Sequence, residues 1–447
     1  SDKIENNTNR LSYGVSVTDL DKDGSYEFII AGFGYPNLAL SYKNGKLINK
    51  NQDPLFADDN RKTIGVSSCD IDQDGYEEIY FLNTDTYSGN KKYSDRLLDM
   101  NNEIFDYFEL EKNFENLNLT AGRSVVCVDR NGSGKYGIYV ANYGGPSRFY
   151  EIEKNEVVDL APILGIDKIT GGRAVVSGHI VSNNMDIFAA NERGPNFLYK
   201  NINGKFYDIA TEKNIEDTFQ NGRGTALTDF LYRGELDIIS SNWEGYHRIF
   251  VKQKNSFLDM SSLEFRSPSR IRTVISADFD NDGYDEIFLN NIGQPNRLFR
   301  ILEEGSLEEI KLDEALEEQG LGTGAAVADI DDDGILELLI SHGESGAQPL
   351  SLFKANVSNN NYIRIKPLNK FGAPARGATV ILNTNLRNHA KTIDAGSGYL
   401  CQMEPVAHYG LRDGEKIENV SIKWTNGNVD TFEVKIINNT LEFKQGI

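Results

Sequence analysis

Four nine-residue stretches with the same acidic spacing decide the fold: DLDKDGSYE (residues 19–27), DIDQDGYEE (70–78), DFDNDGYDE (278–286) and DIDDDGILE (329–337). Each has Asp at positions 1, 3 and 5, Gly at position 6 and Glu at position 9. Short apolar runs precede and follow each stretch. Runs this short, bounded by Gly, Pro, Asn and Asp, are typical of β-strands joined by turns.

Three weaker copies lie between the second and third stretches, starting at Asp129, His179 and Asp229. The seven starts are separated by 51, 59, 50, 50, 49 and 51 residues. Each unit contains four strand-like runs, and repeats of this kind are typical of a β-propeller with one blade per unit. The sequence therefore predicts an all-β protein with a seven-bladed propeller over residues 1–358. The longest spacing indicates an insertion near residues 84–113, which we expect on the surface.

Residues 359–447 break the repeat but continue the strand-like pattern. Short runs such as Tyr362–Ile365 and Val420–Trp424 are separated by turns, including Asn426-Gly427. About seven strands in such a short segment predict a small β-sandwich.

The acidic stretches have the composition of calcium-binding loops, because Ca²⁺ takes six to eight oxygen ligands and Gly permits the sharp bend. An EF-hand is excluded, because position 12 is apolar and the flanks are strands. Asp-rich turns without metal are the alternative. We expect about four structural Ca²⁺ ions, with a backbone carbonyl contributed at position 7. The predicted ligands are Asp19, Asp21, Asp23, Ser25 and Glu27; Asp70, Asp72, Asp74, Tyr76 and Glu78; Asp278, Asp280, Asp282, Tyr284 and Glu286; and Asp329, Asp331, Asp333, Ile335 and Glu337.

Arginine recurs six residues before four consecutive loop starts, at Arg123, Arg173, Arg223 and Arg272. In a propeller this position begins the innermost strand, at one mouth of the central channel. Two interpretations stay open. The arginines could form a site for an anion, or each could join its blade to the next through a carboxylate or carbonyl.

Composition excludes several classes of function. The net charge is −21, with 46 Lys+Arg against 67 Asp+Glu, so a nucleic-acid partner is not expected. No apolar run is long enough for a membrane span. Three cysteines, Cys69, Cys127 and Cys401, show no metal spacing, and we expect buried free thiols.

The acidic loops and their flanking strands resemble FG-GAP repeats over residues ~10–358. The tail resembles the ASPIC/UnbV domain through Arg376-Gly-Ala-Thr-Val380, Gly396-Ser-Gly-Tyr-Leu-Cys-Gln402 and His408-Tyr-Gly-Leu411. This order of domains is similar to that of the cartilage acidic protein family, which has bacterial members. The resemblance implies a secreted, calcium-binding, non-catalytic protein.

From these features we expect a non-catalytic binding or adhesion module, located outside the cytoplasm (secreted, periplasmic or cell-surface), that recognises a protein or glycan. The alternative is an enzyme, or an accessory to natural-product biosynthesis, with an anionic small molecule at the arginines. No known catalytic motif stands out in the sequence.

Overall fold

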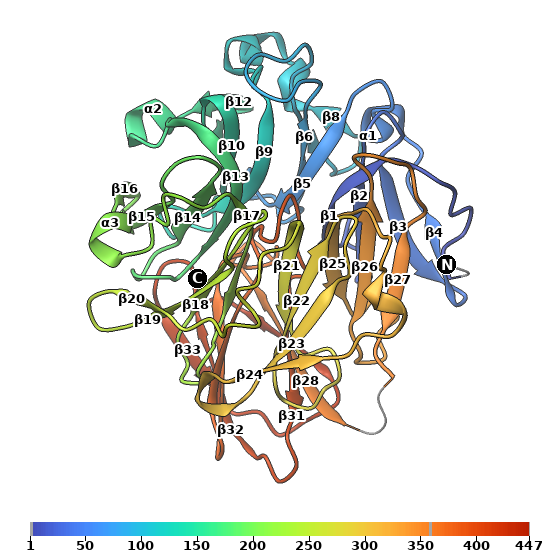
Figure 1. Ribbon diagram of the computed structural model, residues 1–447. Helices are drawn as coiled ribbons and strands as arrows, with labels where there is room; N and C mark the ends of the chain where they lie inside the picture. Colours follow the sequence, from blue (N-terminus) through green and yellow to red (C-terminus); the bar gives the residue numbers. More distant parts are fainter. Residues whose placement is uncertain (1–2, 357–359, 447) are drawn as a thin grey trace.

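The computed structural model describes residues 3–356 and 360–446. It is built almost entirely of β-strands, as predicted (Figure 1). Its described helices have three to six residues each and lie between strands. The α-helices are α1 (Pro54–Ala57), α2 (Ala161–Leu164) and α3 (Ala210–Lys213), and the 3₁₀ turns are η1 (Tyr107–Glu109), η2 (Glu111–Asn116), η3 (Glu303–Gly305) and η4 (Glu314–Leu316). None of these described helices has the length and apolar character needed to cross a bilayer.

The described strands up to residue 354 form successive antiparallel groups that follow the sequence repeat. The first three groups are β1 (Ser12–Thr18), β2 (Glu27–Gly32), β3 (Leu38–Lys43) and β4 (Lys46–Asn49); β5 (Thr63–Cys69), β6 (Glu78–Asn83), β7 (Arg96–Asp99) and β8 (Phe105–Asp106); and β9 (Gly122–Val128), β10 (Gly137–Pro146), β11 (Arg148–Glu153) and β12 (Glu156–Asp159). The next two are β13 (Ile169–Gly178), β14 (Asp186–Asn191), β15 (Phe197–Ile202) and β16 (Lys205–Asp208); and β17 (Gly222–Thr228), β18 (Asp237–Asn242), β19 (Arg248–Lys252) and β20 (Phe257–Asp259). The last two are β21 (Ile271–Ala277), β22 (Glu286–Asn291), β23 (Arg297–Ile301) and β24 (Leu307–Ile310); and β25 (Gly322–Ala328), β26 (Glu337–His342) and β27 (Ser351–Lys354).

The first strand of each group contacts the first strands of its neighbours, and β25 contacts β1, which closes a ring. The strands β10 and β13 also pair directly, so two groups share one eight-stranded sheet. In every group the acidic loop, or its weaker copy, joins the first strand to the second. All the loops therefore lie at one end of the ring, which we call the loop face. The first strands begin at the opposite end, which we call the arginine face.

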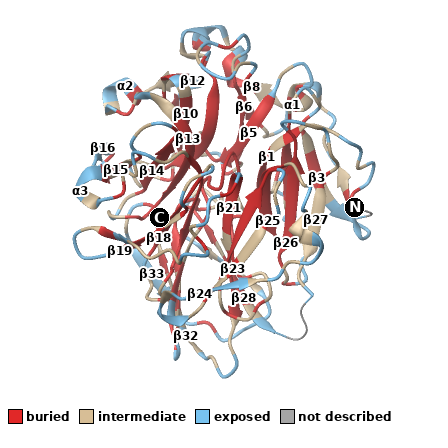
Figure 2. Ribbon diagram, viewed as in Figure 1, coloured by how far each residue is buried: buried red, intermediate tan, exposed pale blue. Residues whose placement is uncertain are grey.

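Apart from the ends of β10 and β13, the first two strands of each group are almost entirely buried, because neighbouring groups cover them (Figure 2). This explains the continuous apolar runs such as Glu27–Gly32, which has no exposed residue. The last group has three described strands. Residues 3–10 do not add a fourth strand to it: Ile4 pairs with Leu47 of β4, and Arg10 pairs with Gln348.

Two sequence expectations are corrected by the structure. Cys69 on β5 and Cys127 on β9 form a disulfide, with Cα atoms 6.3 Å apart, so only Cys401 is a free thiol. The two cysteines stand at nearly equivalent places on adjacent first strands, a relation that their sequence spacing alone does not show. The insertion is a surface excursion only in part, as at Tyr87, which is 60% exposed. It supplies β7 and β8, and its Tyr107 and Phe108 are buried.

The tail forms two packed sheets that share one apolar core. Their strands, in chain order, are β28 (Asn361–Leu368), β29 (Thr379–Thr384), β30 (Asn388–Thr392), β31 (Ala407–Leu411), β32 (Ile417–Lys423), β33 (Val429–Phe432) and β34 (Thr440–Lys444). One sheet has the order β31-β28-β34, and the other has the order β30-β29-β32-β33.

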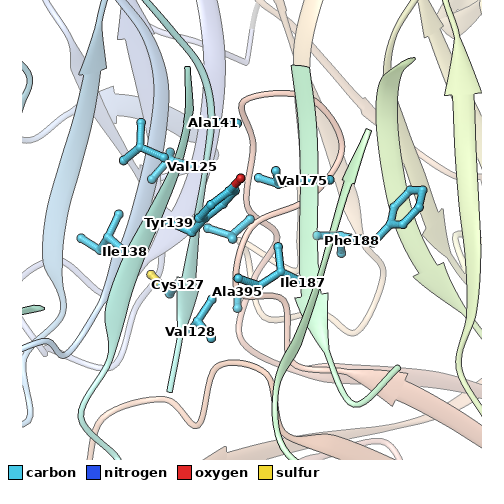
Figure 3. Close-up of a cluster of buried hydrophobic side chains, with 14 of the residues drawn as sticks. Val125, Cys127, Val128, Ile138, Tyr139, Ala141, Val175, Ile187, Phe188 and Ala395 are labelled. Atoms are coloured by element: carbon cyan, nitrogen blue, oxygen red, sulfur yellow. The ribbon is translucent and has the colours of Figure 1, made fainter. Parts of the chain in front are cut away.

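Residues 394–403, which we call the inserted segment, extend from the tail into the centre of the ring. Ala395 lies among Val125, Val175 and Ile187 of the propeller (Figure 3). The backbone pairs with two first strands, at Ser16 with Gln402 and at Thr225 with Gly398. A Cβ atom on Gly14 would lie 2.3 Å from the carbonyl oxygen of Leu400, so this close approach requires glycine. The inserted segment therefore belongs to the core of the propeller, whereas the two sheets of the tail have a core of their own.

Candidate functional site

The four intact acidic loops have one common geometry. The position 6 glycine has a positive φ, and its N–H donates to the position 1 aspartate at 2.9–3.1 Å. The position 9 glutamate accepts from the N–H of position 2 through one oxygen, as Glu78 does from Ile71 at 2.7 Å. Its other oxygen, Oε1, is thereby left for the interior of the loop.

Each loop brings at least three carboxylates together, with oxygens within 4.8 Å of one another. These groups are Asp19, Asp21 and Glu27; Asp70, Asp72 and Glu78; Asp278, Asp280 and Asp282; and Asp329, Asp331 and Asp333. At position 7, the N–H of Ser25, Tyr76, Tyr284 or Ile335 donates to the position 5 aspartate. The structure thus gathers three of the four predicted carboxylates in each loop; Asp23, Asp74, Glu286 and Glu337 lie outside these groups.

Three of the four loops also contain a basic side chain. Lys50 Nζ lies 2.7 Å from Asp21 and 3.0 Å from Glu27 Oε1. Arg300 contacts Asp280, Asp282 and Glu286 at 2.7–3.1 Å. Lys354 Nζ lies 2.5–2.8 Å from Asp331, Asp333 and Glu337. In these loops a protein cation contacts the carboxylates that the sequence predicted as Ca²⁺ ligands.

The loop at residues 70–78 has no such cation among its described neighbours. Oε1 of Glu78, a residue only 1% exposed, has no hydrogen-bond partner. The neighbouring groups are instead Tyr107, whose hydroxyl donates to Asp72 at 3.0 Å, and the carboxylate of Asp99. Burial raises the pKa of Asp70 to about 7, and the negative charges of Asp72 and Asp74 add to this effect. This loop fits Ca²⁺, because its oxygens are concentrated and no ion pair to Asp70, Asp72, Asp74 or Glu78 is formed by the described residues.

The three weaker loops are bonded to the tail. In each of them the residue at position 1 makes the bond. Asp129 accepts from the hydroxyl of Thr425 at 2.7 Å, and Asp229 accepts from the N–H of Ala390 at 3.0 Å. His179 contacts the hydroxyl of Thr379 at 3.0 Å. Two intact loops are joined to it in the same way. Asp278 accepts from Gly410 N–H at 2.8 Å, and Asp329 pairs with Arg364 at 3.1 Å. The tail therefore covers the loop face.

The arginine cluster (Arg123, Arg173, Arg223 and Arg272) lies where the sequence placed it, on the first strands at the arginine face, and the structure brings the four together. All four are 3–6% exposed. Arg173 and Arg223 share Glu192, and Arg272 pairs with Glu344. Arg123 donates to backbone carbonyls, including that of Tyr87. Four guanidinium groups thus face two carboxylates.

Aromatic rings complete this cluster. The guanidinium of Arg173 lies 4.5 Å from the ring centre of Tyr143, and that of Arg272 lies 4.4 Å from the ring centre of Trp243. Tyr399 of the inserted segment approaches from the centre of the propeller, and its ring centre lies 5.9 Å from the guanidinium carbon of Arg272. Burial opposes ionisation of Tyr399, but the charges of the four arginines outweigh it and lower its pKa.

The histidines have structural partners away from this cluster. His389 contacts Asp285 at 3.1 Å, His408 contacts Asn281 at 2.5 Å, and His247 contacts Ser269 at 3.0 Å. Burial is the main cause that lowers the pKa of His389 to about 3. These side chains join the propeller to the tail or join neighbouring groups.

Sequence reasoning missed the side chains that distinguish one acidic loop from another. Glu286 pairs with Arg300, and Glu337 pairs with Lys354, in the strand register. The corresponding neighbour of Glu78 is Asp99, because Ile79 pairs with Leu98. If the repeats are aligned through their third strands, the residue that faces the position 9 glutamate is basic in two of them and acidic in the third. Lys50 has no such signal, because it comes from the end of β4 and reaches its loop from a different strand.

Comparisons with protein families identify the two parts of the chain. A family described as "ASPIC and UnbV" matches residues 369–447, and a family described as "FG-GAP-like repeat" matches residues 278–340. The BP39L lectin from Burkholderia pseudomallei has a similar structure, with a TM-score of 0.50 and 9% identity over 78% of this chain and 97% of the lectin. At that identity the likeness concerns the fold alone.

Curated relatives match over nearly the whole chain. Cartilage acidic protein 1 from Homo sapiens is 46% identical over 95% of this chain and 70% of the human protein. The protein of the same name from Xenopus tropicalis is 44% identical over 96% of this chain and 73% of its own length. Since these relatives are 46% and 44% identical over nearly the whole chain, this chain belongs to the cartilage acidic protein family.

Proposed function

We propose that this protein is a non-catalytic, calcium-stabilised binding module that acts outside the cytoplasm and recognises a protein or glycan partner through its arginine face. The observation that carries the proposal is the difference between the two ends of the propeller. The tail covers the loop face with buried bonds, whereas the arginine face carries exposed apolar side chains. These side chains are Tyr87, Leu119, Ile169, Phe219, Tyr246 and Leu263.

Phe219 is 96% exposed, and Leu263 is 78% exposed. Other exposed apolar side chains lie elsewhere, among them Ile202 and Ile436, but six of them lie at this end. Contiguous apolar patches are typical of interaction surfaces. The rigid sheets beneath hold the loops that present them. The disulfide between Cys69 and Cys127 supports a location outside the cytoplasm, where such bonds persist.

The test places a photo-crosslinking amino acid at Phe219 and, as a control, at Ile436 of the tail, which is 56% exposed. The labelled proteins are incubated with extracellular fluid from the source organism and irradiated, and the adducts are identified by mass spectrometry. We expect a discrete protein or glycan-bearing adduct from position 219 alone. No adduct at that position, or the same adducts from both positions, would contradict the proposal.

A second candidate is an anionic small-molecule site at the arginine cluster. It is supported by the two guanidinium charges in excess of the carboxylates and by the buried Nε atoms of Arg223 and Arg272, which have no hydrogen-bond partner. Inorganic sulfate and a dicarboxylate serve as probes in calorimetry, with Arg123→Ala as the variant, because Arg123 bonds only carbonyls and one hydroxyl. Charge-assisted bonds of about 1.5–3 kcal/mol predict a loss of affinity of roughly tenfold or more. Unchanged affinity would exclude this site.

A further inference from the structure

The acidic loops are alike in sequence but differ in what lies inside them. We propose that Lys50, Arg300 and Lys354 act as built-in cations that replace the divalent ion in three loops, so that only the loop at residues 70–78 binds calcium. This inference rests on the proposed calcium stabilisation and specifies its site.

The first step is the position of the three cations. Each contacts the Oε1 atom of its position 9 glutamate, at 3.0 Å for Lys50 and Glu27, 3.1 Å for Arg300 and Glu286, and 2.5 Å for Lys354 and Glu337. Each also contacts the carboxylates at positions 3 and 5. A cation at this point stands between the oxygens that would coordinate calcium.

The second step is electrostatic. A calcium ion would have to displace the tethered cation, break three ion pairs, and accept a positive charge as a close neighbour. A tethered ammonium or guanidinium group also has a high effective concentration, because it is attached to the same sheet. In two of these loops one oxygen of the position 1 aspartate, Asp19 Oδ1 or Asp278 Oδ1, is also buried without a hydrogen-bond partner. The four loops differ at the position 9 glutamate, whose Oε1 is paired with a cation in three loops and has no partner at Glu78.

The third step is the contrast with residues 70–78. Where the other sheets place Arg300 or Lys354 beside the position 9 glutamate, this sheet places Asp99. Asp99 is buried and adds a negative charge, and the hydroxyl of Tyr107 lies 3.0 Å from Asp72 and 3.4 Å from Asp99. Glu78 Oε1 has no partner in the interior of the loop. Among the described residues, this loop is the one of the four in which no basic side chain forms an ion pair with the carboxylates at positions 3, 5 and 9; its paired cation, Arg376, contacts Glu77 at position 8.

The experiment measures bound calcium per chain by mass spectrometry after calcium loading and gel filtration, with Ca²⁺ itself as the probe. We expect about one ion for the native sequence and about none for Glu78→Gln, whereas the matched change Glu337→Gln leaves one. Asp74→Asn provides a second loss variant in case Glu78→Gln does not fold.

A variant that gains a calcium site gives the more decisive test. Lys50→Met removes the ammonium group from the first loop and leaves its four carboxylates, so we expect two ions per chain. Lys46→Met, at an exposed lysine on β4, is the matched control and leaves one ion. Three or four ions in the native protein, or no gain with Lys50→Met, would overturn this inference while leaving calcium stabilisation intact. No bound calcium at all would overturn both.

Discussion

The docking of the tail on the propeller depends on one buried arginine, and its removal gives a quantitative prediction. Arg376 is completely buried. It donates to Glu77 at 2.7 and 3.1 Å, to Ser68 Oγ at 3.3 Å, and to the carbonyl oxygens of Val17, Asp394 and Met403 at 2.8–2.9 Å. It therefore connects the first two groups of strands to the inserted segment.

We predict that Arg376→Met lowers the free energy of unfolding by about 5 kcal/mol. Removing one partner of a buried ion pair costs about 3–5 kcal/mol, because the other charge is left buried. The three carbonyl oxygens also lose a charged donor, at up to about 1.5–3 kcal/mol for each bond that water does not replace. The sum of these terms is an upper bound, since contributions within one network are not additive.

The assay is urea unfolding followed by fluorescence. The chain has two tryptophans, Trp243 in the propeller and Trp424 in the core of the tail, so Trp243→Phe leaves a probe of the tail alone. In that background Arg376→Met is compared with Lys416→Met, a change at an exposed tail lysine. A loss below about 1 kcal/mol, equal to that of the control, would refute the reasoning. Combining Arg376→Met with Glu77→Gln should cost less than the sum of the two single changes.

Three further predictions concern other parts of the molecule. Reduction of Cys69–Cys127, which closes a loop of 58 residues, should cost about 4 kcal/mol on the chain-entropy model, measured by urea unfolding with and without a reductant. Burial of Glu192 opposes ionisation, but its two arginines outweigh this and lower its pKa to about 2. Its contribution to stability is therefore complete above its ordinary pKa near 4.5 and is lost as the pH falls toward 2, so acid melts should show a smaller loss for Glu192→Gln than for the native protein. Gly410→Ala would place a Cβ atom 2.4 Å from Asp278 Oδ2 and should loosen the tail, detected as faster hydrogen exchange on β31.

The repeat made the fold predictable from the sequence. Each acidic loop marks where a first strand ends and a second strand begins. The regular spacing between the loops predicts that the sheets follow one another in chain order. The pairing of Cys69 with Cys127 required knowing that their strands are neighbours in the ring. Their similar distances from Asp70 and Asp129 contained that information.

The contacts of the tail could not be predicted from its own strand pattern. The Gly396–Gln402 motif reads locally as a turn, and its glycines permit a backbone that lies against the first strands. The basic residues inside the loops were missed for a related reason. Lys50 and Lys354 are distant in sequence from the carboxylates they contact, and only strand pairing brings them together.

The claim that one acidic loop stabilises the fold through calcium is tested most directly by thermal melts with excess Ca²⁺ and with a chelator. At a calcium concentration 100 times the dissociation constant, binding contributes about 2.7 kcal/mol, which corresponds to a shift of about 3 °C for a chain of this length. We predict that the chelator lowers the melting temperature of the native protein by about this amount and leaves that of Glu78→Gln unchanged. An unchanged melt of the native protein, or an equal shift in the variant, would contradict the claim.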